Sequence, residues 1–294
     1  MVKILWQVSF RPLNKSANND DIQNKFIKNI SKLNLDITLA VTQFDEEGIE
    51  DFLNKENLKY KFFNFPKKKL PREKKYSNSI MLQNSLKYYI ENKYNYFVFS
   101  NSDVIINENV SKIFTKKKPK DYMGFIYPNT LVKNGIKISP TTPHYGIDFI
   151  VFQLSMEKAR DFLDLVKMYE QYDWGLIDNF YIACSDKLKL NTENLFKKIN
   201  LIKYENKFSD FDENRDWQIK SWNENFIFFK EFIIKNKLSI FYLYGSYYFL
   251  LLKLFKVKDM NFDLIIVYLK LFLSLPGHLI KKLFYQIRKT LINP

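Results

Sequence analysis

The chain has 294 residues, 46% of them hydrophobic and 17% aromatic, so it is long and apolar enough to bury a sizeable core. Its net charge of +14 indicates an anionic partner such as nucleic acid, anionic lipid or a phosphorylated substrate. A single cysteine, Cys184, excludes an internal disulfide and a cysteine-based zinc site, and it fits a reducing compartment.

The first hundred residues alternate between strand and helix patterns. Apolar and β-branched runs predict strands at 3–10, 35–41, 60–65 and 96–99. Helical periodicity predicts helices at 22–33, 49–57 and 77–92. This order predicts an α/β fold with a Rossmann-type, mostly parallel sheet flanked by crossover helices. Arg11 and Pro12 interrupt the first apolar run, so a strand is the better interpretation than a signal peptide.

The pattern is looser after residue 103. We expect strands at 121–127 and 146–152, helices at 155–169 and 177–188, and a polar loop over 203–225. From about residue 227 the chain becomes helical and very apolar. We therefore predict two parts, a catalytic domain at 1–225 and a helical, basic, apolar extension at 226–294.

A carboxylate follows the fourth predicted strand, in Asn101-Ser102-Asp103. In open parallel sheets, ligands bind beyond the carboxyl ends of the strands. A carboxylate there is suited to Mg²⁺ or Mn²⁺, and such an ion neutralises a departing diphosphate. The alternative is an Asn/Asp turn that merely ends the strand.

The helix, apolar strand and terminal Asp of 77–106 resemble the nucleotide-sugar half of GT-A glycosyltransferases. That family carries an Asp-x-Asp signature at this point, and here it takes the form Asn101-Ser102-Asp103. The resemblance implies that Asp103 is the direct ligand of Mg²⁺ or Mn²⁺ and that Asn101 and Ser102 contact the donor. It also implies that Ser9 or Arg11, after the first strand, touches the base or the diphosphate.

Two further stretches support this resemblance, which covers roughly residues 1–190. The segment 144–152 resembles a Gly-x-Asp-x-x-Val-Phe strand, which implies that Asp148 binds sugar hydroxyls and that His144 contacts phosphate or metal. Asp148 is flanked by apolar residues and is costly to bury unpaired, so it has a partner or faces a cleft. The segment 174–179 resembles one that carries a catalytic carboxylate, which makes Asp178 a candidate general base. The alternative for Asp178 is an acid favoured by the helix dipole.

The tail combines apolar surface with positive charge. Its longest uncharged stretch, 238–252, has 15 residues. A helix of that length spans roughly 22 Å, which is short of the ~30 Å hydrocarbon core. The stretch 279–291 has the amphipathic, basic pattern of a helix lying on an anionic bilayer. The alternative is an ordinary helical subdomain with surface lysines.

Together these features predict a bacterial, hexosyltransferase-like glycosyltransferase of surface polysaccharide biosynthesis (lipopolysaccharide or lipooligosaccharide, capsule, or O-antigen). It would move a sugar from a nucleotide-sugar donor to a glycan or glycolipid acceptor. We expect it in the cytoplasm, peripheral on the inner face of the inner membrane. One alternative is a sugar-nucleotidyltransferase, although SFRPLNKSANN after the first strand lacks a Gly-rich phosphate loop. Another is a non-enzymatic basic membrane- or nucleic-acid-binding protein, although no nucleic-acid motif is present and no nucleic-acid partner is expected.

Overall fold

The computed structural model describes residues 2–13, 17–69, 77–116, 118–126, 128–133, 135–138, 147–169, 176–196, 198–204, 215–239 and 242. Its main sheet has seven strands in the order β10-β6-β9-β4-β1-β2-β3. The strands are β1 Lys3–Val8, β2 Asp36–Gln43, β3 Tyr60–Asn64, β4 Tyr96–Ser100, β6 Tyr122–Ile126, β9 Phe149–Gln153 and β10 Asn191–Asn194. Only β9 runs antiparallel to its neighbours in this sheet. The predicted mostly parallel α/β sheet is therefore confirmed.

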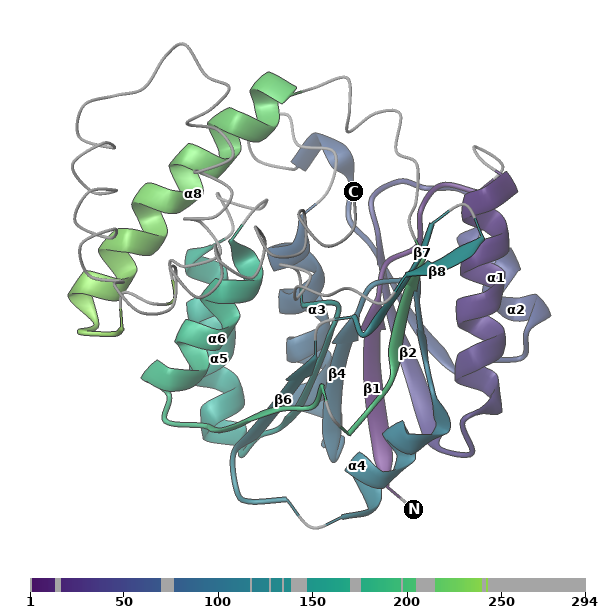
Figure 1. Cartoon of the computed structure of the whole chain (residues 1–294), viewed down its shortest axis with the longest axis horizontal. Helices are drawn as coiled ribbons and strands as arrows, with labels where there is room; N and C mark the ends of the chain where they lie inside the picture. Colours follow the sequence, from purple (N-terminus) through teal and green to yellow (C-terminus); the bar gives the residue numbers. More distant parts are fainter. Residues whose placement is uncertain are drawn as a thin grey trace, which may run out of the picture. The chain divides into compact units, whose positions relative to one another are not determined.

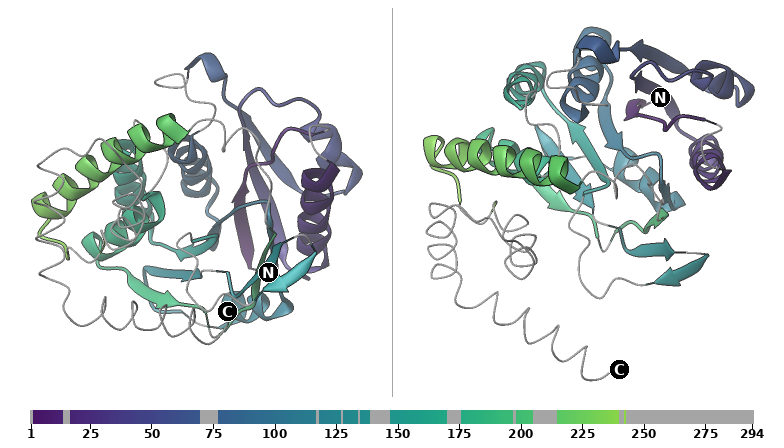
Figure 2. Two further views of the ribbon diagram at one scale, coloured as in Figure 1. Left: turned by 45° about the horizontal axis from the view of Figure 1, so that its top comes forward. Right: turned by 90° about the horizontal axis from the view of Figure 1, so that it is seen from above.

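Helices cover both faces of this sheet (Figure 1). Helices α1 Ala17–Lys32 and α2 Ile49–Lys55 lie on one face, and α3 Asn78–Asn92, α5 Met156–Met168 and α6 Ile177–Lys187 lie on the other. The two views of Figure 2 show the same layers. On the first face, Trp6 and Phe26 belong to one buried cluster. On the second, Phe152 of β9 contacts Phe162 of α5, with ring centroids 4.9 Å apart.

The alternation of side chains explains why β4 reads as continuously apolar. Val98 points to the cluster that contains Trp6, and its neighbour Phe97 lies on the opposite face, where its ring stacks on that of Phe152. Helix α3 begins where the sequence predicted, because the Ser77 hydroxyl accepts a hydrogen bond from the Ile80 amide at 3.1 Å.

A second, smaller sheet was not predicted. Its four strands run in the order β5-β11-β7-β8, and they are β5 Val104–Ile106, β11 Leu201–Tyr204, β7 Thr130–Lys133 and β8 Ile136–Ile138. The expected loop over 203–225 is wrong at both ends, because β11 includes residues 203 and 204 and α8 Arg215–Lys235 includes residues 215–225. Strand β11 pairs with β5 and β7, which lie far away in the sequence. The described part of the chain also contains the short helices η1 Lys67–Lys69, η3 Glu108–Val110 and α4 Ser111–Thr115.

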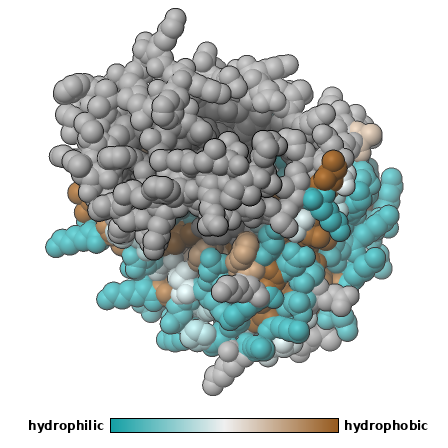
Figure 3. Space-filling model, viewed as in Figure 1, coloured by the Kyte–Doolittle hydropathy of each residue, from teal (hydrophilic) through white to brown (hydrophobic). Residues whose placement is uncertain are grey.

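The chain divides into two compact units, Met1–Phe229 and Lys230–Pro294. Helix α8 runs through the predicted boundary at residues 225 and 226, and the division into a catalytic domain and an extension stays a prediction. The stretches 240–241 and 243–294 of the predicted extension lie outside the described residues. Among the helices that the structure describes, none has the length and hydrophobicity needed to cross a bilayer. In Figure 3 the described part of the visible face is mainly hydrophilic, with hydrophobic residues scattered among polar ones.

Candidate active site

Four predicted site residues lie at the carboxyl end of β4. Asn101, Ser102 and Asp103 follow this strand directly, and Asp148 precedes β9. Because β9 is antiparallel to β4, its beginning lies beside the end of β4. The Asn101 side-chain amide donates to Asp148 Oδ1 at 2.5 Å, and the Asn101 main-chain amide donates to the Asp148 carbonyl at 3.3 Å. The side chains of Asp103 and Asp148 are both buried, so their carboxylates belong to the interior of the site.

Arg11 reaches the same place from the end of β1, which is the neighbour of β4 in the sheet. Its guanidinium Nη2 lies 3.3 Å from Asp103 Oδ2. The burial of Asp103 without a cation nearby would be costly, and this ion pair offsets part of that cost. The structure therefore brings together four of the predicted site residues, Asn101, Asp103, Asp148 and Arg11, and their roles stay predictions.

Two glutamines hold the segment that carries Arg11. Gln43, at the end of β2, accepts from the Phe10 amide at 2.7 Å and donates to the Phe10 carbonyl at 2.9 Å. Gln23 of α1 accepts from the Arg11 amide at 2.5 Å and donates to the Arg11 carbonyl at 3.4 Å. Each glutamine uses both ends of its amide, so the backbone before and at Arg11 is fixed on two sides. Ser9 takes part through its hydroxyl, which donates to Gln43 Oε1 at 3.3 Å.

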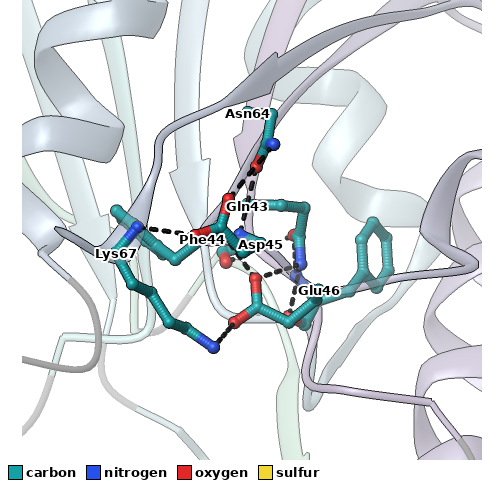
Figure 4. Close-up of polar contacts among 8 residues, drawn as sticks. Gln43, Phe44, Asp45, Glu46, Asn64 and Lys67 are labelled. Carbon is teal, nitrogen blue, oxygen red and sulfur yellow. Dashed lines mark hydrogen bonds and ion pairs between the residues drawn. The ribbon is translucent and has the colours of Figure 1, made fainter. Parts of the chain in front are cut away.

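Gln43 is itself oriented by charged neighbours, which Figure 4 shows at the ends of β2 and β3. Its amide nitrogen also donates to Glu46 Oε2 at 3.3 Å, and Glu46 Oε1 lies 3.1 Å from the ammonium of Lys67. Asp45 links the same loop to the chain after β3, because its carboxylate accepts from the Lys67 amide at 2.7 Å. This network ties the Arg11 segment to the rim of the sheet and to the basic residues that begin at Lys67.

Lys203 is a site residue that the sequence analysis missed. It lies on β11, and its ammonium is 2.6 Å from Asp148 Oδ1. The next residue, Tyr204, donates its amide to the Asp103 carbonyl at 2.9 Å, which fixes β11 beside the end of β4. Burial lowers the pKa of Lys203, but the nearby carboxylates of Asp148 and Asp103 outweigh this effect and hold that pKa above its ordinary value. Lys203 is therefore a permanent cation of the site.

Asp178 lies in the first turn of α6 and completes the group of acids. Its Oδ2 accepts from the Ile147 amide at 2.9 Å, directly before Asp148 in the chain. Desolvation and the charge of Asp148 raise the pKa of Asp178 to about 7, although the Ile147 hydrogen bond and Lys203 act in the opposite direction. A carboxyl group with this pKa exchanges a proton readily near neutral pH, which is the property of a general base.

The donor set around Asp103 does not fit a divalent cation. At phosphate sites Mg²⁺ is held by one or two carboxylates together with substrate phosphates and water, and those carboxylates must be available to the ion. Asp103 and Asp148 are instead each paired with a basic side chain, Arg11 and Lys203. Within the described ranges, no group of three or more His, Cys, Asp or Glu side chains is placed to hold a metal ion. The metal expected at Asp103 stays a prediction.

His144 lies outside the described residues, as does the stretch 170–175 that precedes α6. Cys184 is buried, as a small core residue would be, and burial raises the pKa of its thiol. The sequence offered one signal for Lys203, the placement of a charged residue between Ile202 and Tyr204 in a short apolar run. No sequence signal identified Gln23.

No family model matches the sequence, and no curated protein matches it. Solved structures with partial likeness include the inositol-1-phosphate CTP transferase from T. maritima, with 11% identity and a TM-score of 0.45 over 72% of this chain and 94% of that one. A cytidylyltransferase from Leptospira borgpetersenii has 10% identity and a TM-score of 0.40 over 66% and 74% of the two chains. The glycosyltransferase GlyE of Streptococcus pneumoniae has 9% identity and a TM-score of 0.36 over 66% and 45%. All three TM-scores are below 0.5.

Proposed function

We propose that the chain is a glycosyltransferase that moves a sugar from a nucleotide-sugar donor to a glycan or glycolipid acceptor. The observation that carries this proposal is the meeting of Asp103, Asp148 and Asp178 with Arg11 and Lys203 beyond the carboxyl end of β4. This edge of a parallel sheet is where ligands bind in open α/β folds. A base with a pKa near 7 beside fixed cations suits a reaction that removes a proton and releases an anion.

The reaction assigns a separate task to each group. The Asp178 carboxylate takes the proton from an acceptor hydroxyl, whose oxygen then bonds to the anomeric carbon of the donor sugar. The bond from that carbon to the diphosphate breaks, and the nucleoside diphosphate leaves with the electron pair. Asp148 holds the Asn101 side chain through a hydrogen bond, and Asn101 positions the sugar hydroxyls. The basic side chains face the charge that develops on the leaving group.

A product assay tests this proposal. The protein is incubated with nucleotide sugars and lipid-linked or free glycan acceptors, and in parallel with nucleoside triphosphates and sugar 1-phosphates. A glycosyltransferase releases nucleoside diphosphate from the first mixture, whereas a sugar-nucleotidyltransferase releases pyrophosphate from the second. Pyrophosphate release alone contradicts the proposal. Salt-sensitive RNA binding without either product indicates a basic binding protein instead.

We also propose that the acceptor is a saccharide at the inner face of the bacterial inner membrane, in surface polysaccharide assembly. The support is the sequence of 279–291, in which apolar residues recur at helical spacing among four cations, Lys281, Lys282, Arg288 and Lys289. An enzyme held at this surface meets a lipid-linked acceptor directly. Binding to anionic liposomes tests this part separately from catalysis.

A further inference from the structure

We propose that Arg11 and Lys203 bind the diphosphate of the donor directly, and that this chain therefore transfers its sugar without a divalent cation. This inference rests on the proposed function, because it concerns the same site and the same leaving group. It assigns a ligand to Lys203, which was not among the site residues predicted from the sequence. It also replaces the metal expected at Asp103 with two side chains that the protein supplies itself.

The first support is the difference in exposure between the basic and the acidic side chain of each ion pair. In the pair of Arg11 with Asp103, the side chains are 22% and 8% exposed. In the pair of Lys203 with Asp148, they are 19% and 2% exposed. In both pairs the basic side chain is more exposed than the acidic one. A ligand that enters from solvent therefore reaches the side chains of Arg11 and Lys203 more readily than either carboxylate.

The second support is the charge balance of the site. Among the residues that the structure describes, the buried carboxylates of Asp103 and Asp148 are each paired with a cation, and Asp178 is partly protonated near neutral pH. A divalent ion at Asp103 would have to compete with a guanidinium that is already in place 3.3 Å away. The same two cations offer the donors that phosphate oxygens accept, since guanidinium binds phosphate in a planar, bidentate way and ammonium binds it as a point charge.

The third support is that both cations are held in position before a ligand arrives. Gln23 and Gln43 fix the backbone at Phe10 and Arg11 through paired hydrogen bonds. Lys203 is fixed through β11, which pairs with β5, and through the bond of its neighbour Tyr204 to the Asp103 carbonyl. Groups that are already oriented toward a developing charge lose little freedom when the ligand binds.

A calorimetric titration tests the inference on the wild-type chain. The ligands are the uridine, guanosine, cytidine, adenosine and thymidine diphosphates and inorganic pyrophosphate, each in excess EDTA and again with Mn²⁺. We expect at least one diphosphate to bind in EDTA, with an affinity within about threefold of that in Mn²⁺. Binding that appears only with Mn²⁺ overturns the inference and leaves the proposed function standing. No binding under either condition overturns both.

Variants then identify the cation responsible. Lys203→Met should weaken diphosphate binding about tenfold or more, which is the scale of one lost charge-assisted hydrogen bond. Lys203→Arg keeps the charge and should retain most of the affinity, which separates loss of charge from loss of fold. Lys59→Met is the matched control, because Lys59 pairs with Asp36 at the opposite, amino end of β2. Equal affinity of Lys203→Met and wild type in EDTA would overturn the role of Lys203.

Discussion

Lys203 Nζ lies 2.6 Å from Asp148 Oδ1, although 55 residues separate the two in the chain. This ion pair joins β11 of the small sheet to the start of β9 in the main sheet. Asp148 also accepts from Asn101, so its carboxylate links the end of β4, the start of β9 and β11. The site therefore depends on both sheets, and its stability and chemistry are coupled through one buried acid.

The first prediction concerns stability. Lys203→Met leaves the buried Asp148 carboxylate without its cation, and breaking a buried pair in this way costs about 3–5 kcal/mol. The free energy of unfolding in urea should fall by that amount. Lys59→Met removes the ion pair between the exposed Lys59 side chain and Asp36, and the loss of such a surface pair costs about 0–1 kcal/mol. Similar losses for both variants would show that the Lys203 pair is not buried in solution.

The second prediction concerns the pH dependence of turnover. If Asp178 is the general base, kcat/KM should rise with pH as its carboxyl group ionises and should level off above its pKa of about 7. Asp178→Asn keeps the acceptor oxygen for the Ile147 amide but removes the base, so turnover should fall about 10²-fold or more. The remaining activity should lose this rise. A pH profile that the variant shares with wild type would assign the base to another residue.

The third prediction concerns the stability that the same carboxyl group provides. Its pKa is raised from 3.8 to about 7, so the folded chain binds this proton more tightly than the unfolded chain does. The resulting stabilisation is fully present below about pH 4 and is lost as pH rises to about 7, at about 1.4 kcal/mol per pH unit. Asp178→Asn should remove this dependence. The measurement is the difference in free energy of unfolding between variant and wild type at pH 5 and pH 8, and no change in that difference would contradict the raised pKa.

The fourth prediction concerns how Arg11 is positioned. Gln43→Leu removes both hydrogen bonds to Phe10 and should weaken diphosphate binding through misplacement of Arg11. It should also lower stability by about 1–3 kcal/mol, because buried main-chain groups lose their partners. A double-mutant cycle separates the two effects: in the Arg11→Gln background, Gln43→Leu should still destabilise but should no longer change affinity. Additive losses of affinity would show that Gln43 acts independently of Arg11.

The fifth prediction concerns the basic tail. Removal of residues 279–294 should release the protein from liposomes that contain anionic lipid, because four cations and an apolar face are lost together. Replacement of Lys281, Lys282, Arg288 and Lys289 by Gln tests the charge alone and should weaken binding most at low salt. Co-sedimentation that is unchanged by the deletion would place membrane contact elsewhere or exclude it.

The sequence predicted six of the seven strands of the main sheet because their signals are local, and it missed the four-residue strand β10. The strands β1 to β4 are apolar runs bounded by turns. Ser77 caps helix α3 by accepting from the main-chain amide of Ile80, three residues further along the chain. The acids of the site were also predictable, since Asp103 follows a buried strand and Asp148 stands among apolar residues. Their meeting follows from the antiparallel pairing of β9 with β4, which sets the residue before β9 beside the end of β4.

The partners of these acids were not predictable in the same way. Lys203 lies on the four-residue strand β11, which exists through pairing with β5 and β7, and such non-local pairing leaves little trace in a single sequence. Gln23 acts on Arg11 from a helix 12 residues further along the chain, in a contact set by packing of α1 and not by a motif. The sequence therefore singled out the acids and Arg11, but it did not single out Lys203.

A crystal structure of the wild-type chain with a bound nucleoside diphosphate tests the central claim most directly. The account predicts phosphate oxygens within about 3.2 Å of the Arg11 guanidinium and the Lys203 ammonium, beyond the end of β4. The carboxylates of Asp103 and Asp148 should lie behind those cations. Density for the nucleotide at another place on the chain, or phosphate held by a metal ion on Asp103 with Arg11 displaced, would contradict it.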